Sequence, residues 1–134
     1  MTTMSGTDRC PCRSGAVLAD CCGPVLAQER AARTAEALMR SRYAAFVVGD
    51  VDHLLRTWHP GQRPPAMDLD DTIEWRSLQI VDRVGGGLLD DRGEVEFIAR
   101  FRTAGAAGSL HERSRFVRVD GRWLYVDGDL LRRS

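Results

Sequence analysis

Apolar residues recur every three or four positions between Thr34 and Val48, and this spacing predicts an amphipathic helix with one buried face. The hydroxyl group of Thr34 can cap the start of this helix, and Gly49 can end it in a left-handed conformation. The apolar positions of the predicted face are Ala35, Leu38, Met39, Tyr43, Phe46 and Val47.

A second, shorter helix is predicted directly after the first, and Asp50 can cap its start. The dipeptide His59-Pro60 ends it, because the residue before a proline is pushed out of the helical region. Residues 61–71, which include two adjacent prolines, are predicted to form a loop. The expected buried positions of the second helix are Leu54, Leu55 and Trp58.

The hydrophobic period changes from helical to alternating after residue 71, which predicts strands separated by glycine-rich turns. Asp120-Gly121 is a strong signal for a two-residue hairpin turn, and it sets Arg118 opposite Trp123 and Phe116 opposite Tyr125. Helices followed by consecutive antiparallel strands predict an α+β domain, with the helices packed on one face of a curved antiparallel sheet and a pocket where the sheet bends. The four predicted strands are residues 73–84, 94–103, 109–119 and 122–127.

Alternation divides the last predicted hairpin into two faces with different chemistry. The first face mixes aromatic, carboxylate and hydroxyl groups, as binding pockets do, although the same aromatic residues could simply form core. Its residues are Glu112, Ser114, Phe116, Arg118, Trp123, Tyr125 and Asp127. The residues of the second face are His111, Arg113, Arg115, Val117, Leu124 and Val126.

All 19 basic residues are arginine, since the chain of 134 residues contains neither lysine nor asparagine. Chemistry that depends on lysine, such as Schiff-base formation or a phosphate loop ending in Gly-Lys-Ser/Thr, is therefore excluded. The apolar stretches are too short to span a bilayer, and residues 1–10 lack the apolar centre of a secretory signal. We therefore expect a cytoplasmic protein with no membrane contact.

The 19 basic residues are balanced by 19 acidic residues, which argues against a broad nucleic-acid-binding surface. Residues 92–134 carry nine arginines and six acidic residues, so a local arginine patch is an alternative. Alternation divides these arginines between the two faces of the sheet, however, with Arg113 and Arg115 pointing away from Arg118. We therefore do not expect nucleic acid to be a partner.

All four cysteines fall within thirteen residues, at Cys10, Cys12, Cys21 and Cys22. Four thiolates suit a tetrahedral zinc ion. Two disulfides are an alternative, but adjacent cysteines cannot easily bridge each other, and iron–sulfur clusters commonly use Cys-x-x-Cys runs that this chain lacks. Because the protein would supply all four ligands, the ion has no position for water, and we expect a structural rather than a catalytic zinc site.

The run Cys10-Pro-Cys-Arg-Ser-Gly15, followed by Cys21-Cys22, resembles the SEC-C zinc motif. The rest of the chain resembles the YchJ family of small bacterial proteins, in which that motif precedes a nuclear-transport-factor-2-like (cystatin-like) domain. That family usually has glycine after the second cysteine, so the backbone at Arg13 must tolerate a side chain here. The resemblance implies a SEC-C-like zinc knuckle over residues 1–23 and a cone of helices on a curved sheet over residues 24–134. The matching stretches of this second part are residues 34–46, 57–60, 95–97, 111–116 and 121–128.

Two functions fit these expectations, because the family resemblance itself implies no reaction. The first is a binding or adaptor module, since the SEC-C resemblance implies a zinc knuckle that contacts a partner protein or the ribosome. The open face of such sheets often pairs, so a homodimer is an alternative assembly. The candidate contact residues near the knuckle are Arg9, Arg13, Arg30 and Arg33.

The second function is that of a small-molecule binder or an acid–base enzyme of the lyase or isomerase type, working in the cone pocket. A histidine with a carboxylate could transfer protons there, while Arg40 or Tyr43 stabilises developing negative charge. Arg40 could instead form a structural ion pair with Glu112, whereas an unpaired Arg40 pointing into a cavity would mark an anion site. His53 and His111 are expected to face solvent or the outer surface of the sheet. The candidate pocket residues are Arg40, Tyr43, His59, Glu112, Ser114 and Tyr125.

Overall fold

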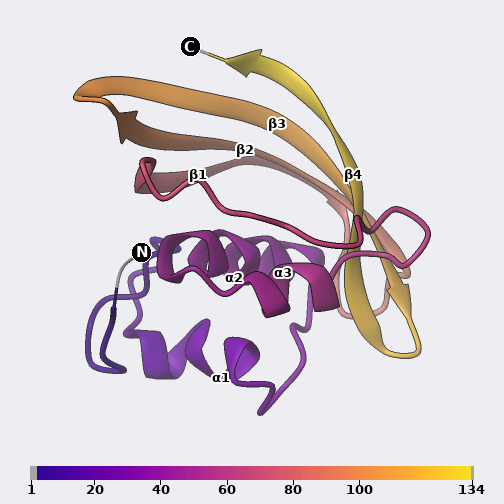
Figure 1. Ribbon diagram of the computed structural model, residues 1–134. Coiled ribbons are helices and arrows are strands. Elements are labelled where there is room, and N and C mark those ends of the chain that lie inside the picture. The colour runs from indigo at the N-terminus through magenta and orange to yellow at the C-terminus, as the bar shows by residue number, and fades with distance from the viewer. Residues whose placement is uncertain (1–2, 134) are drawn as a thin grey trace.

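One curved antiparallel sheet with a layer of helices on its concave side makes up the fold (Figure 1). The computed structural model describes residues 3–133, and the four strands pair in chain order. The predicted α+β class is confirmed. The helices are the 3-10 helix η1 (Leu18–Asp20), α1 (Gly23–Leu26), α2 (Ala35–Val48) and α3 (Val51–Arg56). The strands are β1 (Glu74–Gly85), β2 (Arg92–Thr103), β3 (Ala106–Val119) and β4 (Arg122–Arg133).

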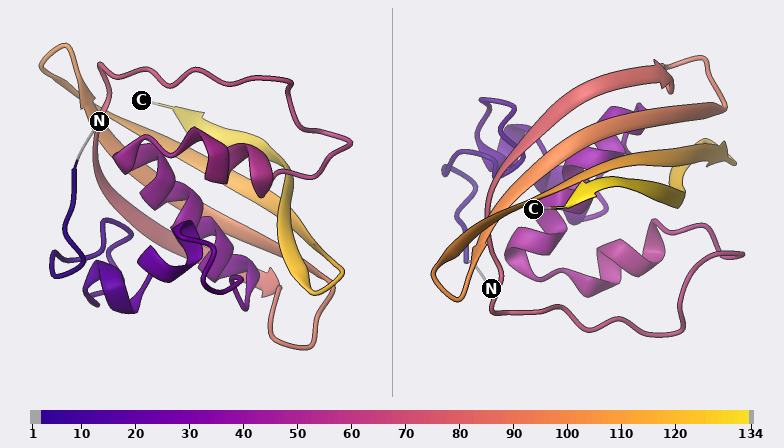
Figure 2. Two further views of the ribbon diagram at one scale, coloured as in Figure 1. Left: turned by 60° about the horizontal axis from the view of Figure 1, so that its bottom comes forward. Right: turned by 90° about the horizontal axis from the view of Figure 1, so that it is seen from above.

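Helix α2 lies across the concave face of the sheet, as both views of Figure 2 show. The Oγ1 atom of Thr34 accepts a hydrogen bond from the N–H of Ala37 (3.0 Å), and Gly49 has a φ of 81°, so both predicted ends of the helix are confirmed. Within residues 3–133, no helix is long and apolar enough to cross a membrane. The core between α2 and the sheet includes Leu38, Tyr43, Phe97, Phe116 and Trp123.

Helix α3 begins after its predicted cap, Asp50, but ends two residues before the predicted Trp58. The helix ends there because the backbone of residues 57–59 pairs with β4. The N–H of Tyr125 donates to the carbonyl oxygen of Thr57 (2.8 Å), and the N–H of His59 donates to the carbonyl oxygen of Tyr125 (2.7 Å). Trp58 and Tyr125 thereby form a short parallel bridge that holds the end of the helical layer to the sheet.

The hairpin at Asp120-Gly121 has the predicted register, with Arg118 opposite Trp123. The guanidinium carbon of Arg118 lies 5.8 Å from the centre of the Trp123 ring, so the two side chains stack. Strand β4 continues past its predicted end, although the next residue, Gly128, weakens the strand pattern. A larger residue at position 128 would displace the carboxyl group of Glu112, because its Cβ atom would lie 2.9 Å from the carboxyl carbon.

A β-bulge in β4 corrects one predicted face assignment. Phe116 pairs with Tyr125 as predicted, but Arg115 pairs with Asp127, so Val126 is an extra residue in β4. The bulge shifts the alternation of the strand by one residue. Asp127 therefore lies on the outer face, where its carboxylate accepts a hydrogen bond from Nε of Arg115 (2.5 Å).

His53 corrects a second expectation, because its side chain is buried in the helical layer and is only 1% exposed. Its Nε2 atom lies 2.9 Å from Oγ of Ser41, which donates to the carbonyl oxygen of Leu38, and its Nδ1 atom accepts from Arg56 (3.1 Å). Burial, together with the positive charge of Arg56, lowers the pKa of His53 to about 4. The imidazole ring is therefore neutral at pH 7.

We expect the free energy of unfolding to decrease as the pH falls from about 6.5 to about 4, because the unfolded chain then binds a proton that folded His53 excludes. The decrease from this one residue is about 1.4 kcal/mol per pH unit. Urea unfolding of the wild type and of His53→Gln at several pH values measures it, and subtracting the two curves removes the contribution of the carboxylates. Parallel curves for the two proteins would contradict the prediction.

Candidate functional site

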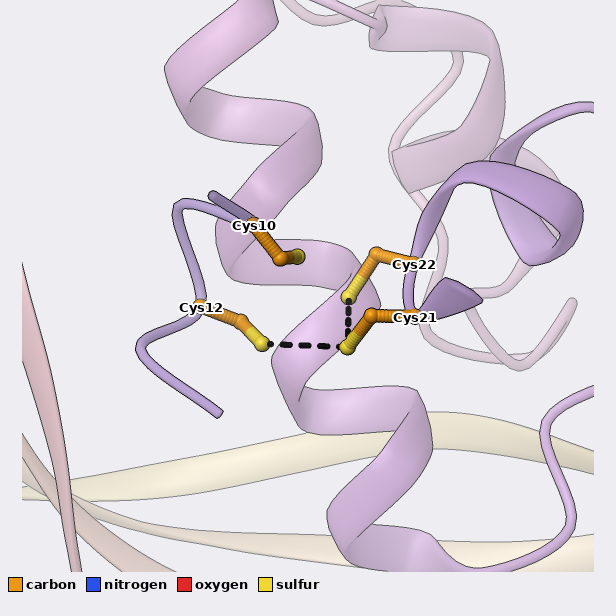
Figure 3. A group of neighbouring side chains, drawn as sticks. All are labelled: Cys10, Cys12, Cys21 and Cys22. Atoms are coloured by element: carbon orange, nitrogen blue, oxygen red, sulfur yellow. Dashed lines mark hydrogen bonds between the residues drawn. The ribbon is translucent and has the colours of Figure 1, made fainter. Parts of the chain in front are cut away.

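The four cysteines come from two segments that face each other beside α2 (Figure 3). All four Sγ atoms lie within 4.8 Å of one another, and the cysteines are free. The Sγ atom of Cys21 lies 3.5 Å from that of Cys12 and 3.9 Å from that of Cys22. A tetrahedral zinc ion with bonds to sulfur of about 2.3 Å requires sulfur–sulfur distances of about 3.8 Å. The group can therefore hold a metal ion of this kind.

A small hairpin positions the first two cysteines of the knuckle, which we define as residues 8–23. Arg9 pairs with Val17 across the hairpin, and the N–H of Cys10 donates to the carbonyl oxygen of Ala16 (2.9 Å). Arg13 has a φ of 68°, a left-handed conformation that favours glycine, so its side chain adds local strain. The side chain reaches the sheet, where Nη2 of Arg13 donates to the carbonyl oxygen of Arg76 on β1.

The knuckle packs directly against the outer side of α2. Its buried cysteines form one apolar cluster with Ala44, whose side chain is fully buried. Arg40 connects the two parts, because its Nη1 atom donates to the carbonyl oxygen of Cys12 (2.7 Å) and its Nε atom donates to Glu36 (2.8 Å). The predicted placement of Arg40 in the cone pocket is therefore wrong, and so is its predicted pairing with Glu112.

The thiol groups of the knuckle cannot all ionise without a cation. Hydrogen bonds that the Cys22 thiol donates to the sulfur atoms of Cys10 and Cys12, together with burial, raise the pKa of Cys22. A second thiolate beside the first is unfavourable in this apolar setting, and a bound metal cation removes that penalty. The donor set and its surroundings therefore fit a metal ion that is enclosed by protein on all four sides.

A cavity of about 290 Å³ lies between α2 and the concave face of the sheet, and we call it the cone cavity. Its polar groups come from α2, β3 and β4, and its other walls are aromatic and aliphatic. A hollow of about 330 Å³ beside residues 28–32 has a mixed lining of polar and apolar residues. The apolar lining of the cone cavity consists of Met39, Phe46, Trp58, Met67, Trp75, Phe97, Ala99 and Leu110.

Two polar residues of the cone cavity lie next to each other on β3. The Oγ atom of Ser114 donates to Oε2 of Glu112 (3.2 Å). Burial raises the pKa of Glu112, and Ser114 and the positive charge of Arg42 oppose that change. Tyr43 and Tyr125 also line the cavity, and burial raises the pKa of each phenol to about 12. Both phenols are therefore neutral at pH 7.

Arg42 is the cavity residue that the sequence analysis missed. Its side chain is 4% exposed, and Nη1 donates to the carbonyl oxygen of Leu54 (2.7 Å) and to Oγ1 of Thr57 (2.8 Å). The guanidinium carbon lies 5.3 Å from the ring centre of Trp58 and 4.5 Å from that of Tyr125. Burial lowers the pKa of Arg42 to about 10, so the group remains charged at pH 7.

The sequence did contain a signal for Arg42. It lies four residues after Leu38 and three after Met39, so it falls inside the apolar stripe of α2. An arginine in such a stripe is buried unless its side chain reaches solvent along the helix surface.

The other predicted pocket residues divide into two groups. Tyr43, Glu112, Ser114 and Tyr125 line the cone cavity, and their roles there stay predictions. His59 is not among the lining residues, and its Nδ1 atom accepts a hydrogen bond from the N–H of Gly61 (3.0 Å) in the turn after α3. The predicted pairing of a histidine with Glu112 in this cavity is therefore wrong.

Comparison with known proteins identifies two matching regions. Residues 34–128 match the family profile described as "YchJ, middle NTF2-like domain", and residues 7–24 match the SEC-C motif. A UPF0225 protein of Streptomyces coelicolor is 51% identical over 125 residues, which cover 93% of this chain and 98% of that protein.

Two solved structures have the same fold. The solution structure of a SEC-C motif containing protein from Rhodopseudomonas palustris has a TM-score of 0.81 and 41% identity, and the match covers 92% of this chain and 98% of that one. A crystal structure of a SEC-C motif containing protein from Psychrobacter arcticus has a TM-score of 0.77 and 26% identity, with 96% and 86% of the two chains covered.

We expect removal of the metal by a chelator to lower the free energy of unfolding by several kcal/mol. In isolated zinc-binding peptides, metal binding contributes about 10 kcal/mol or more to the free energy of folding. Elemental analysis and urea unfolding, before and after chelation, measure the metal content and the loss. Cys21→Ser combined with Cys22→Ser should lose the metal. Ser14→Ala is the matched control, since Ser14 contacts Cys21 (3.1 Å) but supplies no thiolate, and it should keep the metal. Equal metal content in the double variant and the wild type would contradict this assignment.

Proposed function

The chain belongs to the YchJ family of proteins with an N-terminal SEC-C motif, and on this premise we propose that it is a zinc-stabilised protein that binds a small molecule in the cone cavity. The observation that supports this function is the cavity itself, which has aromatic walls and a few buried polar groups. Ligand sites in proteins have this composition. Glu112 and Arg42 bring a carboxyl group and a guanidinium group into an otherwise apolar space.

Zinc is the metal that we propose for the knuckle. Four cysteine thiolates with tetrahedral spacing are the usual ligands of a structural zinc ion, and soft sulfur ligands disfavour magnesium and calcium. The ion would hold the hairpin at Cys10 to the helical turn at Cys22, because the knuckle buries few apolar side chains of its own. The ion would therefore stabilise the fold and would take no part in chemistry at the cone cavity.

Binding is better supported than catalysis at the cone cavity. The acid–base hypothesis paired His59 with Glu112, and His59 lies outside the cavity lining. The buried histidine, His53, is hydrogen-bonded at both ring nitrogens, so neither nitrogen is free to accept a proton from a substrate. The remaining polar groups can orient a ligand.

We expect a neutral aromatic probe, indole, to bind in the cone cavity and to shift the backbone amide NMR signals of residues that line it. Ala99→Leu should weaken this binding by about tenfold or more, because the larger side chain fills the space. Ala107→Leu is the matched control: Ala107 is exposed on β3, and its substitution should leave the affinity unchanged. Shifts confined to residues outside the lining would overturn the proposed function.

An adaptor role for the knuckle is the second candidate, because residues 13–15 form an exposed loop that a partner protein or the ribosome could reach. Several arginines predicted to make this contact are occupied within the chain. Arg9 donates to the carbonyl oxygen of Gly15, and Arg30 donates to that of Cys21 (3.1 Å). We therefore rank this role below ligand binding, and the homodimer stays a prediction.

The adaptor role predicts that partners captured from a cell extract are lost when the knuckle is disrupted. A pulldown that compares the wild type with the Cys21→Ser, Cys22→Ser protein tests this, with Ser14→Ala as the control. Retention of every partner by the double variant would rule out recruitment through the knuckle.

A further inference from the structure

We propose that the cone cavity selects a small carboxylate with an aromatic body, and that Arg42 recognises its negative charge. This inference rests on the proposed function, since it names the class of ligand that the cone cavity binds. It follows from the contacts of Arg42, from the polar groups around it and from the shape of the cavity.

Arg42 is a buried cation without a carboxylate partner. Arg113, on the exposed face of the sheet, forms ion pairs with Asp82, Glu94 and Glu96 at 2.7–3.1 Å. Arg42 is far more buried than Arg113. In the part of the chain that the structure describes, however, no carboxylate oxygen lies within 4 Å of its guanidinium nitrogens, the limit for an ion pair. Buried charges in proteins are normally paired, because leaving water is costly for them. A bound anion would complete this arrangement.

The geometry of the guanidinium group also favours a carboxylate. Nη1 is the donor of both hydrogen bonds that Arg42 makes within residues 3–133. Its Nε and Nη2 atoms therefore keep donor capacity, and two adjacent donors match the two oxygen atoms of a carboxylate. The indole N–H of Trp58, another residue of the cavity lining, is buried and has no acceptor in the described residues. Arg42 and Trp58 therefore both offer donors that have no acceptor among the described residues.

Among the described residues, Glu112 is the one carboxyl group in the cavity lining, and it would compete with an anionic ligand for the positive charge of Arg42. The groups that face it are Arg42 on α2, Tyr125 on β4 and the hydroxyl group of Ser114 on its own strand, and its partner on β2, Phe97, is apolar. The negative charge of Asp129 acts on Glu112 from the outer face of β4, where Asp129 pairs with Arg115. A ligand carboxylate would add a second negative charge near Glu112. Binding should therefore favour the protonated form of Glu112, which can then donate a hydrogen bond.

The cavity walls limit the body of the ligand to an apolar group of about one ring. Trp75 on β1 packs against two aromatic residues of α2, with its ring centre 6.0 Å from that of Tyr43 and 5.8 Å from that of Phe46. A volume of about 290 Å³ is near the lower end of the range for ligand pockets. A monocyclic aromatic carboxylate is therefore a suitable probe.

Three probes of nearly identical shape test the charge preference in the unaltered protein: benzoate, benzamide and the benzamidinium ion. We expect benzoate to bind about tenfold or more tightly than benzamide, and benzamidinium to bind most weakly, because only benzoate can pair with Arg42. Amide NMR titrations of the wild type give all three affinities. Equal affinities for benzoate and benzamide, or tighter binding of benzamidinium, would overturn the inference even if no variant of Arg42 folded.

Variants then assign the charge preference to its residue. Arg42→Met should lose the preference for benzoate over benzamide while still binding indole, and Arg42→Lys should keep part of it. A preference that survives in Arg42→Met would show that another group recognises the anion. The indole result separates this inference from the proposed function. If indole binds and benzoate has no advantage, only the inference fails, and if no probe binds, both fail.

The pH dependence provides a readout that general damage to the cavity would not produce. The affinity for benzoate should decrease as the pH rises through the titration of Glu112, whereas that for benzamide should change less. Glu112→Gln, which resembles the protonated acid, should bind benzoate at least as tightly as the wild type and with little dependence on pH. Weaker binding of benzoate by Glu112→Gln at every pH would contradict the role given to Glu112.

Discussion

Helix α2 is buried on two opposite sides, and the arrangement of both candidate sites depends on this. Toward the sheet, Leu38 and Tyr43 pack in the main core with Phe97 and Phe116. On the other side, Ala44 packs against the buried cysteines of the knuckle. A helix enclosed in this way needs small residues where the backbone of the knuckle approaches, and it needs partners for every polar group that it buries. Those partners come from the knuckle and from α3.

The arginines of α2 show how the two sides differ. Arg40 lies on the knuckle side, where it donates to the carbonyl oxygen of Cys12 and pairs with Glu36. Arg42, only two residues later, lies among Trp58 and Tyr125 at the cone cavity. A rotation of about 200° separates two positions that are two residues apart on a helix. One arginine therefore supports the metal site, and the other defines the chemistry of the cavity.

The features that follow from local rules could be predicted from the sequence. The period of α2, its cap at Thr34 and the turn at Asp120-Gly121 depend on neighbouring residues, and the spacing of the cysteines is equally local. The errors arise where distant parts of the chain meet. The bulge at Val126 depends on the pairing of two strands, and the burial of His53 depends on Ser41, twelve residues away.

The difference between local and distant determinants also explains why only some of the predicted pocket residues were placed correctly. Alternation along β3 placed Glu112 and Ser114 on one face correctly, because a strand without a bulge has a fixed period. It placed Asp127 wrongly because the bulge intervenes. The helical period places Arg42 inside the apolar stripe of α2 and Arg40 about 200° away from it. The pattern could not show that Arg42 lacks a carboxylate partner among the described residues, because that depends on distant parts of the chain.

Arg40 also connects the knuckle to the wall of the cone cavity. Its side chain binds the carbonyl oxygen of Cys12, and the helix that carries it, α2, lines the cavity with its other side. An ion in the knuckle and a ligand in the cavity would both stabilise the same placement of α2. By thermodynamic linkage, each would then increase the affinity of the protein for the other, without any contact between them. The concentration of metal would thereby set the fraction of chains in which the cone cavity can bind its ligand. The apparent dissociation constant of the ligand would vary inversely with that fraction.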